Sequence, residues 1–138
     1  ITQNIDGLHQ KAGSKKVLEL HGSVQRNYCM KCRAFYSLDY IIESKSIPIC
    51  HCGGIIKPDV VLYEEPLDEE IIREAIRLIR RAELLIVGGT SLTVYPAAGL
   101  IDYYEGDKLV LINKSVTGYD RRAKLLISSS LGEVFSKI

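Results

Sequence analysis

Residues 84–91 read Leu84-Leu85-Ile86-Val87-Gly88-Gly89-Thr90-Ser91. Four apolar residues in a row, ended by two glycines, are typical of a strand that is buried on both faces. Such strands occur in parallel sheets that helices cover, so this stretch predicts an α/β fold. The small residues that follow the strand would let the backbone approach a phosphate or a ribose.

The segments on either side extend this prediction. Upstream, Leu67–Ala82 has apolar residues at helical spacing, acidic residues in its first turn and arginines in its last turn, as the helix dipole favours. Downstream, the sequence predicts a short helix, two further strands and a final helix, at Pro96–Tyr104, Lys108–Ile112, Lys124–Ile127 and Glu133–Ile138. Strands that alternate with helices over short connections predict βαβ units in a doubly wound parallel sheet.

The four cysteines fall as Cys29-x2-Cys32 and Cys50-x-Cys52, with seventeen residues between the pairs. Two close pairs at this separation predict a structural zinc site made of four thiolates. Because the second pair has a gap of only one residue, His51 is an alternative ligand. Two disulfides, or buried thiols without metal, are the other interpretations. We predict a zinc-binding module at residues 26–57, inserted into a nucleotide-binding domain at residues 1–25 and 58–138.

Composition excludes several classes of protein. The chain has 138 residues, of which 46% are hydrophobic, so it can bury a core and is not intrinsically disordered. A net charge of +1 argues against a nucleic-acid-binding protein and against a polybasic membrane anchor. No apolar run is long enough to span a bilayer and no signal peptide opens the chain, so we expect a cytoplasmic location without membrane contact.

Three segments are candidates for ligand binding. Gly88–Ser91 and Asn113–Ser115 follow buried strands, at the sheet edge where ligands bind in open α/β folds. Thr2–Asp6, which precedes His9 and His21, is rich in amide and carboxylate groups. Each segment also has a purely structural interpretation, as a turn with Ser91 capping a helix, a turn at Asn113, or histidines with structural hydrogen bonds. No G-x-G-x-x-G motif is present.

Taken together, the motifs resemble those of the sirtuin family, the NAD-dependent protein lysine deacylases. The matching segments are Thr2-Gln3-Asn4-Ile5-Asp6-Gly7-Leu8-His9, His21-Gly22, the paired cysteines, Lys57-Pro58-Asp59-Val60-Val61, Gly89-Thr90-Ser91-Leu92 with Val94 and Pro96-Ala97, and Ile112-Asn113. They occur in the family's order from Thr2 to about Val134. The resemblance implies a partial Rossmann-like, NAD-binding domain with an inserted zinc module, in which Cys29, Cys32, Cys50 and Cys52 hold a structural Zn²⁺.

The resemblance also implies a mechanism and a role for individual residues. In sirtuins the acyl oxygen of an acyl-lysine attacks the nicotinamide ribose of NAD, nicotinamide leaves, and the acyl group moves to ADP-ribose. His21 would be the general base that deprotonates a ribose hydroxyl. The residues that would contact NAD are Gln3, Asn4, Ile5, Asp6, Gly89, Thr90, Ser91, Asn113, Lys114, Ser115 and Leu131. Acylated lysine peptides would be the partners.

The peptide would add as an extended strand between the loop that follows Val61 and the loop at Val94. Where many members have Phe-Gly-Glu in the first of these loops, this chain has Tyr63-Glu64-Glu65. A side chain and a charge therefore replace the glycine beside the substrate strand, which predicts a preference for basic peptides. Val61, Tyr63, Glu64 and Val94 are the predicted peptide-binding residues.

The sequence begins at Ile1, and its only methionine is Met30. We therefore expect the chain to be the C-terminal portion of a longer protein, with the family's glycine-rich turn and NAD-closing loop upstream of Thr2. By itself such a chain is expected to bind NAD weakly or not at all. Two alternative functions stay open: a non-enzymatic, zinc-stabilised binding remnant, and a protein ADP-ribosyltransferase. The sequence does not indicate the oligomeric state, the acyl-chain preference or the protein targets.

Overall fold

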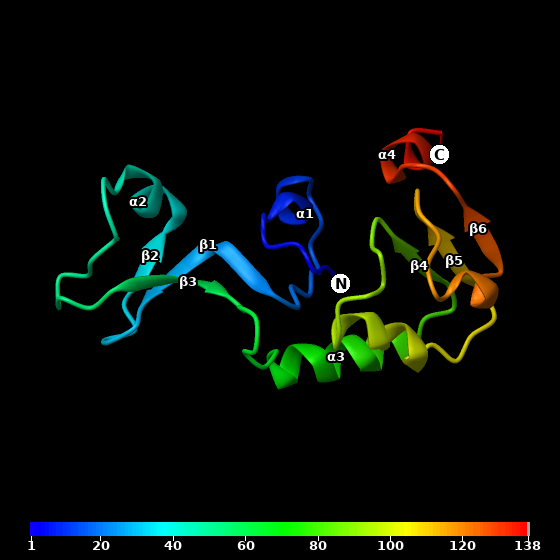
Figure 1. Cartoon of the computed structure of the whole chain (residues 1–138), viewed down its shortest axis with the longest axis horizontal. Coiled ribbons are helices and arrows are strands. Elements are labelled where there is room, and N and C mark those ends of the chain that lie inside the picture. The colour runs from blue at the N-terminus through cyan, green and yellow to red at the C-terminus, as the bar shows by residue number, and fades with distance from the viewer. Residues whose placement is uncertain (138) are drawn as a thin grey trace. The chain divides into compact units, whose positions relative to one another are not determined.

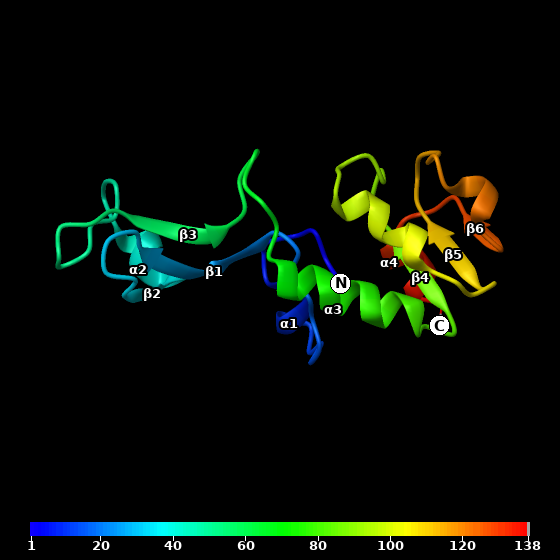
Figure 2. The same cartoon turned by 90° about the horizontal axis from the view of Figure 1, so that it is seen from below.

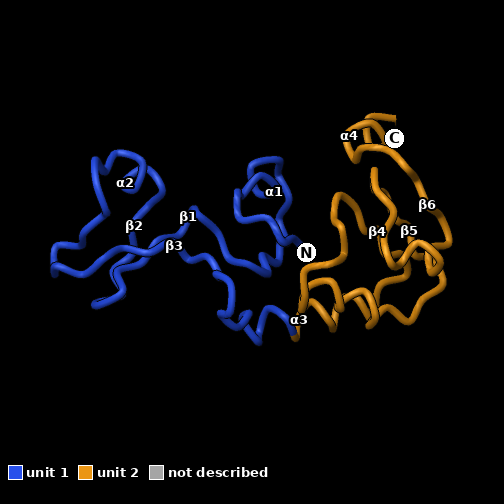
Figure 3. Tube along the Cα trace, viewed as in Figure 1, with its two compact units in different colours: residues 1–72 blue, residues 73–138 orange. Residues whose placement is uncertain are grey.

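The computed structural model describes residues 1–137, which form two units, residues 1–72 and residues 73 onward (Figure 3). The division falls within helix α3 (Glu69–Arg80). Each unit is described by itself. The assignment of residues 1–25 and 58–138 to one domain and of residues 26–57 to another stays a prediction.

The first unit contains an antiparallel three-stranded sheet in the order β2-β1-β3 (Figures 1 and 2). Its elements are α1 (Leu8–Lys11), β1 (Gly22–Cys29), β2 (Phe35–Ser37), α2 (Leu38–Glu43) and β3 (Ile56–Val60). β1 is the central strand and pairs Tyr28 with Phe35 of β2 and with Lys57 of β3. The chain between β2 and β3 carries the second cysteine pair back to the end of β1, where the first pair lies.

The pairing of β1 with β3 is interrupted between Ser23 and Asn27. Pro58, which has no N–H to donate, lies opposite Asn27 at this irregularity. Both Ser23 and Asn27 are 1% exposed: the Asn27 amide donates to the Val24 carbonyl at 3.1 Å, and the Ser23 hydroxyl donates to the Ile5 carbonyl at 3.4 Å. The polar side chains that the bulge buries therefore have hydrogen-bond partners both within β1 and on neighbouring segments.

The second unit contains a parallel sheet in the order β4-β5-β6. β4 (Leu85–Gly88), β5 (Leu109–Ile112) and β6 (Leu125–Ile127) match the three predicted strands, and α3 and α4 (Leu131–Phe135) match two predicted helices. Two short 3₁₀ helices complete the unit, at Ala97–Tyr103 and Asp120–Arg122. α3 begins at Glu69 because the Asp68 carboxylate accepts the N–H groups of Glu70 and Ile71 at 2.8 and 3.0 Å.

One expectation about this sheet is wrong. The run Leu84–Val87 predicts a strand buried on both faces, but Ile86 of β4 is 45% exposed. The most buried strand is β5, where Leu109, Leu111 and Ile112 are at most 3% exposed and Val110 is partly buried. The reason is sheet order, since β5 has a neighbour on each side and β4 has one neighbour among the described residues.

Two helix boundaries also differ from the prediction. The Pro96–Tyr104 segment forms a 3₁₀ helix, and the final helix begins at Leu131, two residues before the predicted Glu133. Ser130 and Glu133 form a capping box that sets this start. The predicted end at Ile138 lies outside the described residues. No helix within residues 1–137 combines the length and the apolar character that crossing a bilayer requires.

Candidate functional site

The Thr2–Asp6 segment lies beside residues 18–21, the segment that leads into β1. Thr2 forms a parallel bridge with Glu19: its N–H donates to the Leu18 carbonyl at 2.8 Å, and its carbonyl accepts from the Leu20 N–H at 2.9 Å. This pairing places His21 against the segment, where its Nδ1 lies 2.9 Å from the Gln3 carbonyl oxygen. Two motifs that are eighteen residues apart in sequence therefore form one local site.

The backbone that follows Gln3 is fixed by short-range hydrogen bonds. The Ile5 carbonyl accepts the Val24 N–H at 3.0 Å, and Asp6 Oδ1 accepts the Leu8 N–H at 3.0 Å. Gly7, at φ 71°, turns the chain directly into α1. The side chains of Asn4 and Asp6 stay exposed, so they are accessible to a ligand.

An ion-pair network that sequence reasoning missed braces this segment. Arg26 of β1 donates from Nη1 to Glu19 and from Nε to Asp59, both at 2.8 Å. Glu19 is only 7% exposed and also accepts from the side chain of Gln10 at 2.8 Å. The partners are 7 and 33 residues from Arg26 in the sequence, and no spacing rule in the sequence indicates that they meet.

Gly22 brings the His21 segment into close contact with β3. Its φ is 76°, and a Cβ at this position would lie 1.9 Å from the Asp59 carbonyl oxygen. Val61 directly follows β3, and its N–H donates to the His21 carbonyl at 3.1 Å. The predicted base and the start of the predicted peptide loop are therefore joined by a backbone hydrogen bond.

Residues 62–65 form a tight turn. Glu65 closes it, since its carboxylate accepts the Leu62 N–H at 2.9 Å and its N–H donates to the Leu62 carbonyl at 3.1 Å. The Leu62 hydrogen bond, together with Lys57, lowers the pKa of Glu65. Glu64 has φ 70°, a left-handed conformation that favours glycine, and the Tyr63 side chain is 99% exposed.

The second unit holds a cavity of about 300 Å³ at the carboxyl ends of β4 and β5. Seven of its lining residues are predicted cofactor contacts: Gly89, Thr90, Ser91, Asn113, Lys114, Ser115 and Leu131. Leu131 covers the glycine turn closely, because a Cβ on Gly88 would lie 2.4 Å from its side chain. Ile112, from the matched pair Ile112-Asn113, also lines the cavity, as do Ser129 and Ser130, which were not predicted.

The polar groups of this cavity are held by local bonds. The Asn113 amide donates to the Ser115 carbonyl at 2.9 Å, and Thr90 Oγ1 accepts the Leu92 N–H at 3.2 Å. Ser91 bonds to the Thr93 hydroxyl at 2.7 Å and does not cap a helix, so the capping interpretation is wrong. Val94 lies in the loop that follows and is 51% exposed.

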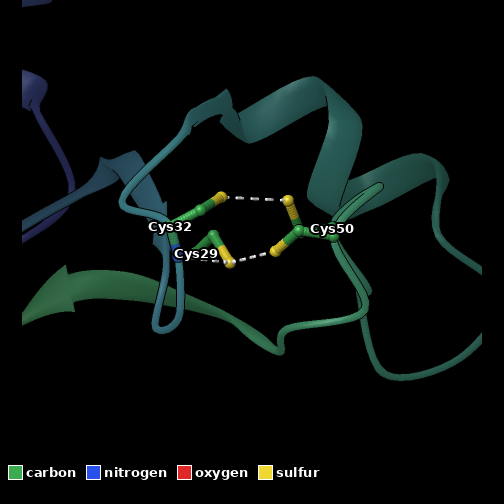
Figure 4. A group of neighbouring side chains, drawn as sticks. Cys29, Cys32 and Cys50 are labelled. Atoms are coloured by element: carbon green, nitrogen blue, oxygen red, sulfur yellow. Dashed lines mark hydrogen bonds between the residues drawn. The ribbon is translucent and has the colours of Figure 1, made fainter.

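The four cysteines converge at the end of β1 (Figure 4). All four Sγ atoms lie within 4.8 Å of one another, with Cys29–Cys52 and Cys32–Cys50 each at 3.5 Å, and no pair is bonded as a disulfide. The N–H groups of Cys32 and Lys31 point at the Cys29 sulfur and lower the pKa of its thiol to about 6. Four soft thiolates at this separation fit a tetrahedral Zn²⁺.

The second cysteine pair depends on the glycines after it. Gly53 has φ 78°, and a Cβ on Gly54 would lie 2.6 Å from the Cys29 sulfur. The one-residue gap between Cys50 and Cys52 is thus compatible with convergence of all four sulfurs. His51 lies outside this group, and its Nδ1 is 3.2 Å from the Tyr36 hydroxyl.

Comparison with known proteins gives consistent matches. The model of the Sir2 family matches residues 1–96. An NAD-dependent protein deacetylase of Clostridium perfringens is 64% identical over 140 residues, which cover all of this chain and 57% of that protein. An enzyme of the same name from Staphylococcus aureus is 46% identical, with the same coverage. The chain therefore spans a little over half the length of these relatives.

Solved structures show the same fold. A crystal structure of Sir2 with the inhibitor EX-527, 2′-O-acetyl-ADP-ribose and deacetylated p53 peptide has a TM-score of 0.90 at 44% identity. It is matched over 98% of this chain and 60% of the other. A structure of Sir2 with p53 peptide and NAD⁺ has a TM-score of 0.89 at 45% identity. Together with the parallel sheet and the cysteine cluster, these likenesses confirm the predicted Rossmann-like α/β fold with a zinc-binding module.

Proposed function

The chain belongs to the Sir2 family, and on that basis we propose that it serves the NAD-dependent removal of acetyl and other acyl groups from protein lysines. Its curated relatives are named NAD-dependent protein deacetylases, and the solved Sir2 structures that it resembles contain NAD⁺, acetylated peptide or 2′-O-acetyl-ADP-ribose. Because the chain spans 57% of those relatives, the proposal concerns the protein of which these residues are a part.

The observation that carries the proposal is the hydrogen bond of His21. A carbonyl oxygen only accepts, so the contact between Nδ1 and the Gln3 carbonyl requires the proton to reside on Nδ1. The lone pair is then on Nε2, which has no hydrogen-bond partner within residues 1–137. An imidazole held in this tautomer is suited to accept a proton from a ribose hydroxyl, as a general base does.

The residues around the two candidate sites fit NAD. Exposed carboxamide and carboxylate groups of Asn4 and Asp6 suit recognition of the nicotinamide carboxamide. The hydroxyls and amide of the cavity at β4 and β5 suit ribose and phosphate, with Gly89 allowing close approach of the backbone. When bound, NAD supplies the electrophilic ribose carbon and nicotinamide as leaving group. We assign Gln3, Ile5, Thr90, Ser91, Asn113, Lys114, Ser115 and Leu131 to the same ligand.

Four thiolates would fill all four coordination positions of a tetrahedral zinc, and they lie apart from His21 in the sequence. We therefore assign the zinc a structural role. The free cysteines support a reducing, cytoplasmic location.

For the acylated peptide we propose strand addition along Val61, Tyr63 and Glu64 on one side and Val94 on the other.

The assignment of the base is tested in the full-length protein by replacing His21. We expect His21→Ala to lower nicotinamide release from NAD and acetylated peptide by about 100-fold or more, since a general base contributes 10²–10⁴-fold. His9→Ala, which removes the exposed histidine of α1, is the matched control and should retain activity. Undiminished turnover by His21→Ala contradicts the assignment. Mass spectrometry of the products that finds ADP-ribosylated protein without deacylation contradicts the reaction.

Glu64 supports a preference for substrates with a basic residue next to the acyl-lysine. Its carboxylate has no partner within residues 1–137, whereas that of Glu65 is engaged by the Leu62 N–H and Lys57. We expect Glu64→Gln to raise KM for an acetylated peptide with flanking arginines several-fold at low salt, and to leave KM for a neutral peptide unchanged. Glu43→Gln, at an exposed glutamate of α2, is the control. Equal effects on both peptides would exclude this role.

A further inference from the structure

The side chain of Tyr36 lies at the edge of the cysteine cluster. Its hydroxyl oxygen is 3.0 Å from the Cys50 sulfur and 3.2 Å from Nδ1 of His51. A metal-bound thiolate only accepts hydrogen bonds, so the Tyr36 hydroxyl must donate its single proton to Cys50. The oxygen is then free to accept, and Nδ1–H of His51 is the donor. The three groups form a chain of hydrogen bonds from His51 through Tyr36 to Cys50.

The position of this hydroxyl is set by regular structure. Tyr36 is in β2, opposite Asn27 of β1, and its ring packs against that of Tyr40 in α2 with centroids 4.6 Å apart. It also contacts the small core made by Cys29, Cys50 and Ile56, which are at most 4% exposed. The hydroxyl is therefore held at the sulfur by packing on both sides, and its orientation requires no metal.

We propose that Tyr36 is a positioning residue of the zinc site, which holds the Cys50 thiolate in place and keeps His51 out of the ligand set. A donor to a thiolate disperses its negative charge, and partners of this kind affect metal affinity 10- to 100-fold, as an order of magnitude. His51 acts mainly through Tyr36, because its Nδ1 is 3.2 Å from the phenolic oxygen and 3.6 Å from the Cys50 sulfur, and its proton polarises the hydroxyl toward that sulfur. Tyr36 would hold the Cys50 thiolate in this way whether or not the chain is catalytically active.

The test uses the whole chain loaded with zinc, and measures zinc release to excess chelator with a metal-sensitive dye. Tyr36→Phe keeps the ring and removes the hydroxyl, and we expect it to release zinc about 10-fold faster or more. Tyr40→Phe is the matched control, because its hydroxyl donates to the Ile49 carbonyl at 3.1 Å and not to a sulfur. A Tyr36→Phe rate within twofold of the unsubstituted chain overturns the proposal.

His51→Ala gives a second, independent test that leaves the tyrosine packing intact. It should speed zinc release less than Tyr36→Phe does, and less in the Tyr36→Phe background than in the unsubstituted chain, because the shorter contact of His51 is with the Tyr36 hydroxyl. In the Co²⁺-loaded chain, Tyr36→Phe should shift the thiolate-to-metal absorption band, whereas His51→Ala should keep the spectrum of four thiolates. If His51→Ala changes the absorption intensity of the Co²⁺-loaded chain as the loss of one metal ligand does, His51 is a ligand and the proposal is overturned.

Discussion

Gly22 has two separate reasons to be glycine. Its φ of 76° is unfavourable for other residues, and a Cβ would lie 1.9 Å from the backbone oxygen of Asp59. A backbone atom in a paired strand cannot move aside as the end of a flexible side chain can. The site around His21 therefore depends on this residue for its close approach to β3 and for the hydrogen bond between Val61 and His21.

We expect Gly22→Ala to lower the free energy of unfolding by roughly 2–4 kcal/mol, from the left-handed backbone and the clash together. Urea denaturation measures it. Gly13→Ala is the control: Gly13 has φ 95° but nothing within 4 Å of an added Cβ, so only the backbone cost of about 1 kcal/mol applies. Equal losses in the two variants would show that the approach to Asp59 is not tight.

For individual residues, the sequence indicates which ones belong to a site better than it indicates which residues they contact in the fold. The Thr2–Asp6 segment, His21 and the four cysteines are recognisable as motifs, and the structure brings the members of each group together. The ion pairs of Arg26 with Glu19 and Asp59 were not predicted, and neither was Tyr36 at the Cys50 sulfur. Each of these contacts depends on which strand lies beside which, and that is not a local property of the chain.

Among the elements, α4 owes its start to its cap. Ser130 Oγ accepts the Glu133 N–H at 3.3 Å, and the Glu133 carboxylate accepts from the hydroxyls of Ser129 and Ser130 at 2.6 and 2.9 Å. These hydrogen bonds lower the pKa of Glu133, first through Ser129 and then through Ser130. Ser129 and Ser130 also line the cavity at β4 and β5, so the cap shapes that site.

We expect Ser130→Ala to lower the free energy of unfolding by about 1 kcal/mol, the usual value of an N-cap. Equilibrium denaturation at neutral pH measures it. Ser136→Ala, at the other end of α4, is the matched control: its hydroxyl donates to the Glu133 carbonyl at 3.0 Å but receives no helix N–H. A loss no larger than that of the control contradicts the capping role.

The lowered pKa of Glu133 also predicts a pH dependence. A carboxyl whose folded pKa is below its unfolded value stabilises the fold above the unfolded pKa, and this contribution is lost as pH falls through the folded pKa. The stability difference between the unsubstituted chain and Glu133→Gln should therefore be present at pH 7 and shrink in acid. Thermal melts of both chains, recorded from pH 7 down to acidic pH, measure this stability difference, and Glu43→Gln is the control. A difference independent of pH contradicts the ionic contribution.

The element pattern of the second unit was largely predictable because its signals are local, whereas the helices and strands of the first unit were not predicted. Three apolar runs predicted the strands β4, β5 and β6, and the arrangement of acidic and basic residues predicted α3. Which strand is buried on both faces was not predictable, since the apolar runs of β4 and β5 are alike and only the sheet order distinguishes them. The capping box at Ser130 was readable in principle from the serine and glutamate three residues apart.

At the scale of the whole molecule, the cysteine cluster is the feature that an experiment can remove. Its sulfurs connect the end of β1 to the segment before β3, and the small core around Cys29, Cys50 and Ile56 is built on them. Structural zinc contributes directly to folding free energy, because the site does not exist in the unfolded chain. Removal of the metal therefore affects more than the four ligands.

We expect a chelator to abolish hydrogen-exchange protection of the Cys29 and Met30 amides, which donate to the carbonyls of Ala34 and Ile55 at 2.9 Å. Hydrogen exchange with mass spectrometry, with and without chelator, measures it. Cys32→Ser, which removes one ligand, should show the unprotected pattern without chelator. Full protection after complete removal of zinc would show that the module folds without the metal.

The sequence alone determined the residue types, the order of the motifs and the periodicity of the elements, because each of these is set by neighbours along the chain. From them followed the fold class, the family and the candidate residues of the sites. The tertiary structure alone decided the non-local contacts: the proton position on His21 through Gln3, the bracing of Glu19 by Arg26, the exclusion of His51 from the sulfur cluster, and the burial of β5 instead of β4. These contacts depend on packing between distant segments, for which spacing along the chain carries no information.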